Sequence, residues 1–162
     1  MLAPPGSLHP PKRLERPTVD VLLSCGQLDF EFKALIDTGA PRNVFPRGCA
    51  DALAIDLSGT HKTVRQHELL GNRWDAVPVL VHLTLPPFHD LTWEAEVDFL
   101  LDDWPMPFGL LGQEGFLDRW VVIFNRYKDY FIVQEVDAFE QRLPVDPWEA
   151  FQQDWDGWNR PG

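Results

Sequence analysis

One carboxylate stands out in the sequence because it directly follows a continuous apolar stretch. Ala34-Leu35-Ile36 is apolar, and Asp37-Thr38-Gly39-Ala40 comes next. A strand that ends in such a run enters the protein interior, so Asp37 would stand at the edge of the core. A carboxylate in that position can act as a general base, or as an acid when it is protonated. The same residues also suit an ordinary Asx-type turn leaving a strand, which would be preferred if nothing accompanied them.

A second apolar run ends in glycine further along the chain. Phe108-Gly109-Leu110-Leu111 leads into Gly112, and the segment Gln113–Arg119 is predicted to form one or two helical turns. An Asp-Ser/Thr-Gly-Ala/Ser tetrapeptide alone is expected by chance in about one chain in a hundred of this length. Two such elements in this order, each at the end of an apolar stretch, favour chemistry over a simple turn.

This pair of motifs resembles the pattern of the retropepsin-like aspartic proteases, the family of retroviral and retrotransposon proteases with bacterial members. The segment from Leu110 to Arg119 is especially similar to the second signature of the bacterial group. The resemblance covers residues 18 to 134. It implies an all-β closed barrel with one short helix after the second signature. It also implies an aspartic endopeptidase that acts on a peptide or protein substrate without a metal or cofactor.

The resemblance gives each residue of the first motif a role. Asp37 supplies one catalytic carboxylate, and because the chain holds one such motif, the second carboxylate must come from Asp37 of another copy in a two-fold homodimer. Thr38 is expected to hydrogen-bond across the dimer axis, and Gly39 to bring its amide close to the carboxylate. Ala40 lacks a hydroxyl that some members carry and that would stabilise the ionised pair, so we expect a pH optimum nearer to neutral.

Two further loops follow from the resemblance. The second loop, where the chain passes beneath the catalytic loop and only glycine fits, comprises Leu110, Leu111 and Gly112. A flap that closes over bound peptide and excludes water is expected to include Leu70, Gly71, Asn72 and Trp74. The viral flap has several glycines, whereas this segment has one. For Trp74 a place in the substrate channel and a structural cross-strand role are equally compatible with the sequence.

Alternating apolar and polar residues predict the strands that position these motifs. Thr18–Ser24 and Leu28–Ile36 are expected to form a hairpin around Cys25-Gly26-Gln27. Further β-structure is expected at 44–45, 60–67, 74–85, 91–101 and in a last hairpin at 121–134, with a hairpin tip at 68–73 and a short helix at 48–54. Many short strands with little helical periodicity indicate an all-β barrel or sandwich.

Composition divides the chain into three parts. Residues 1–17 are proline-rich and predicted to form a flexible arm, residues 18–137 form the protease domain, and residues 138–162 form an acidic, tryptophan-rich tail. In the tail, Asp146-Pro147-Trp148-Glu149 predicts a helix start. That helix would carry on one face Trp148, Phe151, Trp155 and Trp158. The stripe could pack on the barrel, join a dimer contact or dock another protein.

Charge and composition argue against several other functions. The net charge of -11 opposes binding to nucleic-acid phosphates, and no stretch of 18 apolar residues suits a membrane span. The first 17 residues lack the apolar core of a secretory signal, and Cys25 and Cys49 do not make a disulfide framework. We therefore expect a cytoplasmic protein with two reduced thiols, one of them buried and inert.

No metal site is expected, because the histidines match no common ligand spacing. They are His9, His61, His67, His82 and His89. Two alternatives to an active protease stay open. One is a retropepsin-fold module that dimerises or binds peptides without turnover. The other is a protease kept latent by its own tail.

Overall fold

The computed structural model describes residues 16–59, 63–86, 91–128 and 130–141 of the chain. The strands are β1 (Thr18–Cys25), β2 (Leu28–Ile36), β3 (Asn43–Phe45), β4 (Arg65–Leu69), β5 (Asn72–Thr84), β6 (Thr92–Leu100), β7 (Gly109–Leu111), β8 (Trp120–Asn125) and β9 (Tyr130–Glu135). The helices are α1 (Arg47–Ala52) and α2 (Val136–Glu140), and a 3₁₀ turn, η2 (Arg126–Lys128), lies between β8 and β9. Except at the start of β4, these bounds confirm the predicted strands within two residues, and they confirm α1 within two. No helix among the described residues is long and apolar enough to span a membrane.

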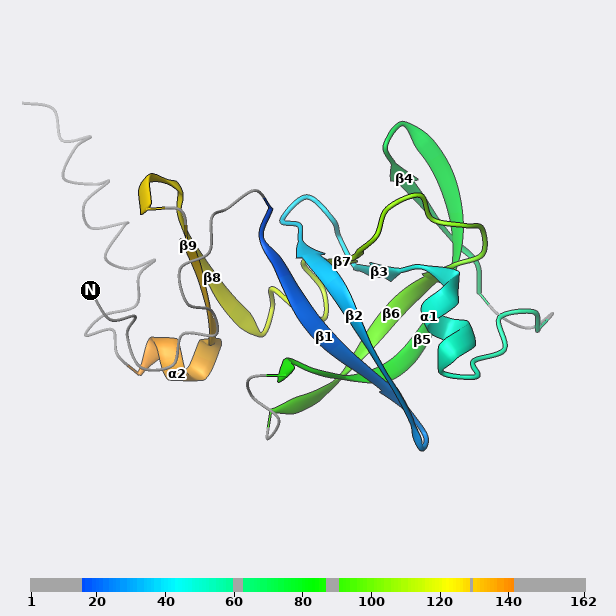
Figure 1. Ribbon diagram of the computed structural model, residues 1–162, viewed down its shortest axis with the longest axis horizontal. Helices are drawn as coiled ribbons and strands as arrows, with labels where there is room; N and C mark the ends of the chain where they lie inside the picture. Colours follow the sequence, from blue (N-terminus) through cyan, green and yellow to red (C-terminus); the bar gives the residue numbers. More distant parts are fainter. Residues whose placement is uncertain (1–15, 60–62, 87–90, 129, 142–162) are drawn as a thin grey trace, which may run out of the picture.

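One sheet closes on itself to make a barrel (Figure 1). Its strand order is β1-β2-β7-β3-β6-β5-β4, and β1 also pairs with β5. The closing contact is short and runs from Leu22 opposite Thr84 to Ser24 opposite His82. Alternate residues of β1 fill the interior, where Val19, Val21 and Leu23 are buried, whereas the short strands β3 and β7 are buried throughout. The all-β closed barrel expected from the motifs is confirmed.

The two apolar runs noted in the sequence lie side by side. β2 and β7 pair in parallel, with Ala34 opposite Gly109 and Ile36 opposite Leu111. Because parallel strands point the same way, the residues that follow both runs emerge at the same edge of the barrel. Gly109 is required here, since a Cβ at this position would lie 2.7 Å from the Phe45 ring.

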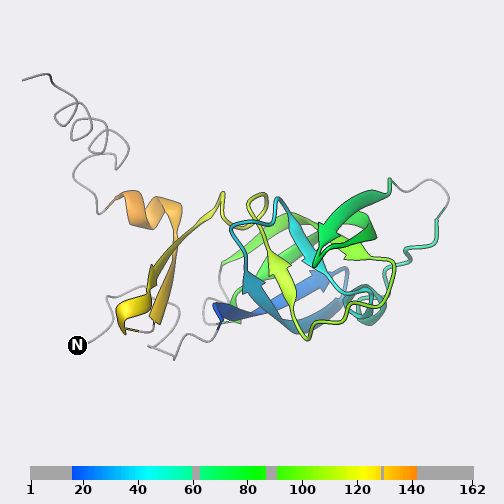
Figure 2. The ribbon, with the colours of Figure 1, turned by 90° about the horizontal axis from the view of Figure 1, so that it is seen from above.

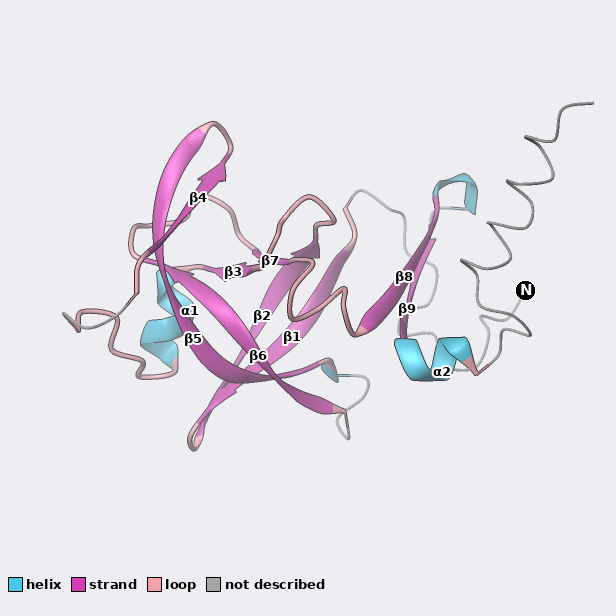
Figure 3. Cartoon of the chain, turned by 180° about the vertical axis from the view of Figure 1, so that it is seen from behind, coloured by secondary structure: helices cyan, strands magenta, loops and turns pink. Residues whose placement is uncertain are grey.

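A hairpin formed by β4 and β5 extends beyond the barrel (Figure 3). Its turn is only Leu70-Gly71, because Leu69 pairs with Asn72. The expected six-residue tip at 68–73 is therefore wrong: both central residues have positive φ, 55° and 75°, which suits a tight two-residue turn. β4 also begins at Arg65 rather than at residue 60, and residues 60–62 lie outside the described part.

Turns replace the helix expected after the second signature. The segment 113–119 has no helix, and its bonds include Leu117 N–H to Gly112 O and Asp118 N–H to Gln113 O, each five residues back. Gly115, with φ of 90°, interrupts helical geometry in the middle of the segment, and its N–H donates to the Asp118 carboxylate at 3.0 Å. The helical expectation failed because a left-handed glycine stands where a helix would need a right-handed residue.

The β8–β9 hairpin lies to one side of the barrel in both Figure 1 and Figure 2. At its base Trp120 is buried and packs edge-to-face on Trp93 of β6, with ring centroids 5.4 Å apart. Helix α2 follows β9 and was not predicted, so the boundary proposed at residue 137 falls inside an element. Residues 1–15 of the arm predicted at 1–17, and the helix predicted after residue 146, lie outside the described residues.

Candidate active site

Asp37 stands where β2 ends, and the turn that follows holds its carboxylate. Its backbone N–H donates to Leu111 O at 3.0 Å, which ties it to the end of β7. The Gly39 N–H donates to Asp37 Oδ1 at 2.9 Å, and the Ala40 N–H donates to Asp37 O at 3.2 Å. Asp37 is half-buried, while Thr38 and Gly39 are exposed. One backbone donor, the Gly39 N–H, thus holds the carboxylate at a surface-accessible position, while two further bonds hold the Asp37 backbone.

The loop after β7 supports this turn from below. A Cβ at Gly112 would lie 2.4 Å from Arg42 O and 2.7 Å from Ala40 O, so only glycine fits at this crossing. The Gln113 N–H donates to Ala40 O, and its side-chain Nε2 donates to Thr38 O, both at 2.9 Å. The loop after β7 thus lies directly against the backbone that follows Asp37.

Asn43 completes the support and was missed at the sequence level. Its side chain is fully buried, and its Oδ1 accepts the Gly112 N–H at 3.0 Å. A buried amide that bonds to a backbone group holds that group in place. The available signal was an asparagine beside the apolar residues Val44 and Phe45, where a strand interior would not normally place one.

A cleft of about 990 Å³ opens next to Asp37. One wall is the turn from Asp37 to Pro41, and another is the run from Gln66 to Leu70 in β4 and the turn that follows it. Much of the rest is apolar and includes Leu35, Trp104, Met106, Phe108 and Leu110. A largely apolar groove with few polar groups suits an extended peptide or another amphipathic ligand.

The structure separates the residues expected in the flap. Leu70 lines the cleft, whereas Gly71, Asn72 and Trp74 do not. Trp74 packs edge-to-face on Trp104, with centroids 5.4 Å apart, and its Nε1–H donates to Leu69 O at 3.2 Å. Of the two roles left open for Trp74, the structural one is observed. Of the second loop, Leu110 reaches the cleft while Leu111 and Gly112 lie behind it.

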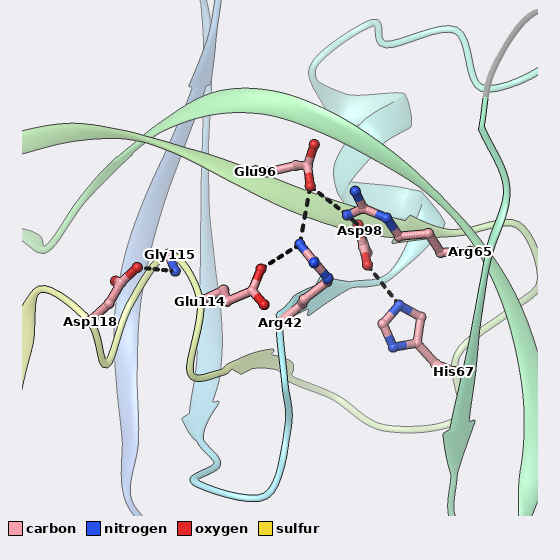
Figure 4. Close-up of polar contacts among 8 residues, drawn as sticks. All are labelled: Arg42, Arg65, His67, Glu96, Asp98, Glu114, Gly115 and Asp118. Atoms are coloured by element: carbon pink, nitrogen blue, oxygen red, sulfur yellow. Dashed lines mark hydrogen bonds and ion pairs between the residues drawn. The ribbon is translucent and has the colours of Figure 1, made fainter.

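A chain of charged side chains connects the hairpin to the loops around Asp37 (Figure 4). In β6, Asp98 is buried, and its two oxygens contact Arg65 at 3.0 Å and His67 at 2.8 Å. Arg65 also bonds to Glu96. Glu96 contacts Arg42 at 3.3 Å, and Arg42 contacts Glu114 at 2.7 Å.

Contacts with the neighbouring carboxylates raise the pKa of Arg65. The hydrogen bond to Glu96 is the largest cause that raises the pKa of Arg65 above its ordinary value, and the charge of Asp98 acts in the same direction, while burial opposes it. Arg65 therefore stays charged, and it balances the buried Asp98 carboxylate. Sequence reasoning considered His67 only as a metal ligand and did not single out Asp98.

Cys49 is the buried thiol expected from the sequence. It lies in α1, is 1% exposed, and burial raises its pKa from 9.0 to about 12. Both cysteines are free thiols, and Cys25 is half-buried. Cys49 is therefore a packing residue with no role in the cleft.

Comparison with known proteins supports the fold. No protein-family model matches the sequence, and no curated protein matches it. Among solved structures, a retropepsin-like aspartic protease from Rickettsia conorii is similar, with a TM-score of 0.53 and 17% sequence identity over 75% of this chain and 92% of that one. The closed barrel, the parallel β2–β7 pair and this likeness together give the chain the fold of the retropepsin-like aspartic proteases.

Proposed function

We propose that the chain is an aspartic endopeptidase that is active as a homodimer. The observation that carries this proposal is the place of Asp37, which lies on a backbone-held turn beside a peptide-sized cleft. The fold is one on which a protease is known, but fold alone does not establish activity. The residues around Asp37 supply the chemical argument.

The proposed reaction uses one Asp37 carboxylate from each subunit. Two carboxylates in contact share a proton, because both cannot carry charge at short range. The ionised member accepts a proton from a water molecule, which then attacks the scissile carbonyl carbon. The protonated member donates to the oxygen on which negative charge develops. The C–N bond then breaks, and the amine leaves with a proton.

Three features support a second copy at this site. The chain contains one such aspartate motif, and Thr38 and Gly39 beside it are exposed and available to a partner. The β8–β9 hairpin presents Ile123 and Phe124 with 40% and 44% exposure, and Phe124 lies on the border of the same cleft. Exposed apolar residues close to the catalytic turn fit a self-association surface.

The direct test measures cleavage of a proteome-derived peptide library between pH 4 and 7.5 by the wild type and by Asp37→Asn. We expect cleavage that is lost in Asp37→Asn and whose specific rate falls on dilution. Asp29→Asn is the matched control, since Asp29 is exposed in the β1–β2 hairpin and does not line the cleft. Absence of cleavage by a folded, dimeric wild type would favour a module that binds without turnover.

A further inference from the structure

His67 is the one histidine among the described residues that lines the cleft. It lies on β4, two residues from Leu69, so both side chains point to the same face of the strand. Its exposure is 7%, whereas its neighbours Gln66 and Glu68 are exposed. A polar ring held this deeply in a largely apolar groove needs a hydrogen-bond partner.

Asp98 supplies that partner and thereby determines which ring nitrogen carries the proton. The Nε2 atom of His67 lies 2.8 Å from Asp98 Oδ2, and an ionised carboxylate only accepts hydrogen bonds. Nε2 must therefore donate. Asp98 is itself 1% exposed and is paired through Oδ1 with Arg65, so its charge is held in place. In the neutral ring Nδ1 is then an acceptor.

The second ring nitrogen is directed away from Asp98. Figure 4 shows it on the opposite side of the ring from the nitrogen that contacts Asp98. Both the turn at Asp37 and His67 line the cleft. The other charged residues of the lining are Arg16, Asp37 and Glu68. A ligand in the cleft would therefore lie next to the imidazole of His67, whose orientation is fixed by Asp98, among mostly apolar side chains.

We infer that His67, oriented by Asp98, is a specificity-determining residue that selects substrates with an amide or hydroxyl side chain at one subsite. A neutral ring accepts a hydrogen bond at Nδ1, and a doubly protonated ring donates one there. Amide and hydroxyl side chains both donate and accept hydrogen bonds, so they can pair with Nδ1 in either protonation state of the ring. They are the side chains of Asn, Gln, Ser and Thr. An apolar side chain at the same subsite would leave the buried nitrogen without a partner, which is unfavourable. This inference rests on the proposed protease function.

The test is a cleavage-site profile. A proteome-derived peptide library is digested by the wild type and by His67→Phe, and residue frequencies at each position around the cleaved bonds are read by mass spectrometry. We expect one position at which the wild type favours amide and hydroxyl side chains over apolar ones, and at which His67→Phe loses that preference by about tenfold. His67→Gln retains a donor for Asp98 and an acceptor for the substrate, so it should keep the preference.

The control is His82→Phe, the same substitution at an exposed site of β5 that does not line the cleft. Thermal melting verifies that each variant is folded. If His67→Phe does not fold, His67→Leu removes the same nitrogens in a smaller volume and must show the same loss. An unchanged profile with cleavage that still requires Asp37 would overturn the inference and leave the protease function intact. No cleavage dependent on Asp37 would overturn both.

Discussion

Residue 112 must be glycine because no side chain fits at this position. The carbonyl oxygens of Arg42 and Ala40 occupy the space that a Cβ would need, and these atoms belong to the backbone that follows Asp37. A flexible side chain could move aside, whereas a backbone held by hydrogen bonds at Gln113 and Asn43 cannot do so without disturbing the turn. The geometry of the carboxylate thus depends on a residue that makes no contact with substrate.

Gly112→Ala is therefore expected to destabilise the protein by about 1–3 kcal/mol, the range for overpacking a tight site. The free energy of unfolding in urea measures this loss. The control is Gly48→Ala in α1, where a Cβ meets nothing within 4 Å and where alanine should stabilise the helix by roughly 0.5–1 kcal/mol. Equal effects of the two substitutions would contradict the crowding at position 112.

Burial of the Cys49 thiol predicts that the free energy of unfolding falls at alkaline pH. Its pKa is raised from 9.0 to about 12 in the folded protein, so above pH 9 the unfolded chain loses a proton that the folded chain keeps. The stabilising contribution is complete below pH 9 and is lost as the pH rises toward 12. Between pH 9 and 10.5 the unfolding free energy should fall by up to about 2 kcal/mol from this group.

Urea unfolding at pH 8 and 10.5 compares the wild type with Cys49→Ala. The variant should show a smaller decline than the wild type, because its buried thiol is gone. Cys25→Ala serves as the control, since Cys25 is only half-buried. A decline in Cys49→Ala as steep as that of the wild type would disprove the assignment.

The sequence predicts the residues of the turn at Asp37 better than the residues that support it. Asp37, Gly39 and Gly112 belong to motifs of fixed spacing, so they could be named in advance. The place of Asn43 in an apolar strand marks it as unusual but does not identify its partner, and His67 carries no local signal, because each depends on a contact with a residue far along the chain. Such contacts follow from strand order, which residue types alone do not specify.

At the scale of elements, two sets of side-chain contacts attach the β4–β5 hairpin to the rest of the protein, in addition to the backbone pairing of β5 with β6. The Trp74–Trp104 pair joins it to the loop before β7, and Arg65 and His67 join it to β6. The tip from Leu70 to Gly71 lies beyond both attachments. We therefore expect the tip to move more freely than its base, as a flap over the cleft requires.

Trp104→Ala should loosen the hairpin, because an aromatic pair contributes about 0.5–1.5 kcal/mol beyond its buried area. Amide hydrogen exchange at residues 65–75 should become roughly tenfold faster, while exchange in the β1–β2 hairpin stays unchanged. Tyr127→Ala, at a 95% exposed aromatic residue of η2, is the control. Equal acceleration in both hairpins would indicate general destabilisation instead.

Strands were predicted more accurately than turns. Alternation located β1 and β2 within a residue, because one face of each strand is buried. The hairpin tip was overestimated because Leu70 adopts a positive φ that its residue type disfavours. The segment after Gly112 was taken for a helix because nothing local shows that Gly115 is left-handed.

At the scale of the whole molecule, the proposed dimer makes the β8–β9 hairpin a candidate contact between copies. Phe124→Lys should raise the dimer dissociation constant at least tenfold, because a charge would replace an apolar side chain in a buried contact. Analytical ultracentrifugation measures the shift. Leu80→Lys is the matched control, since Leu80 is 58% exposed on β5 and does not line the cleft. An unaltered dissociation constant in Phe124→Lys would place the contact elsewhere.

The parallel pairing of β2 with β7 has a consequence for how the protein reaches its active form. The bond from Gln113 to Thr38 joins residues 75 positions apart, and that from Gly112 to Asn43 joins residues 69 positions apart. Folds dominated by such distant contacts have high contact order and fold slowly, on a scale of milliseconds to seconds. During synthesis the turn at Asp37 leaves the ribosome long before the glycine that supports it. A nascent chain therefore cannot form the supported turn at Asp37 early, and this turn reaches its final geometry only when the barrel is nearly complete.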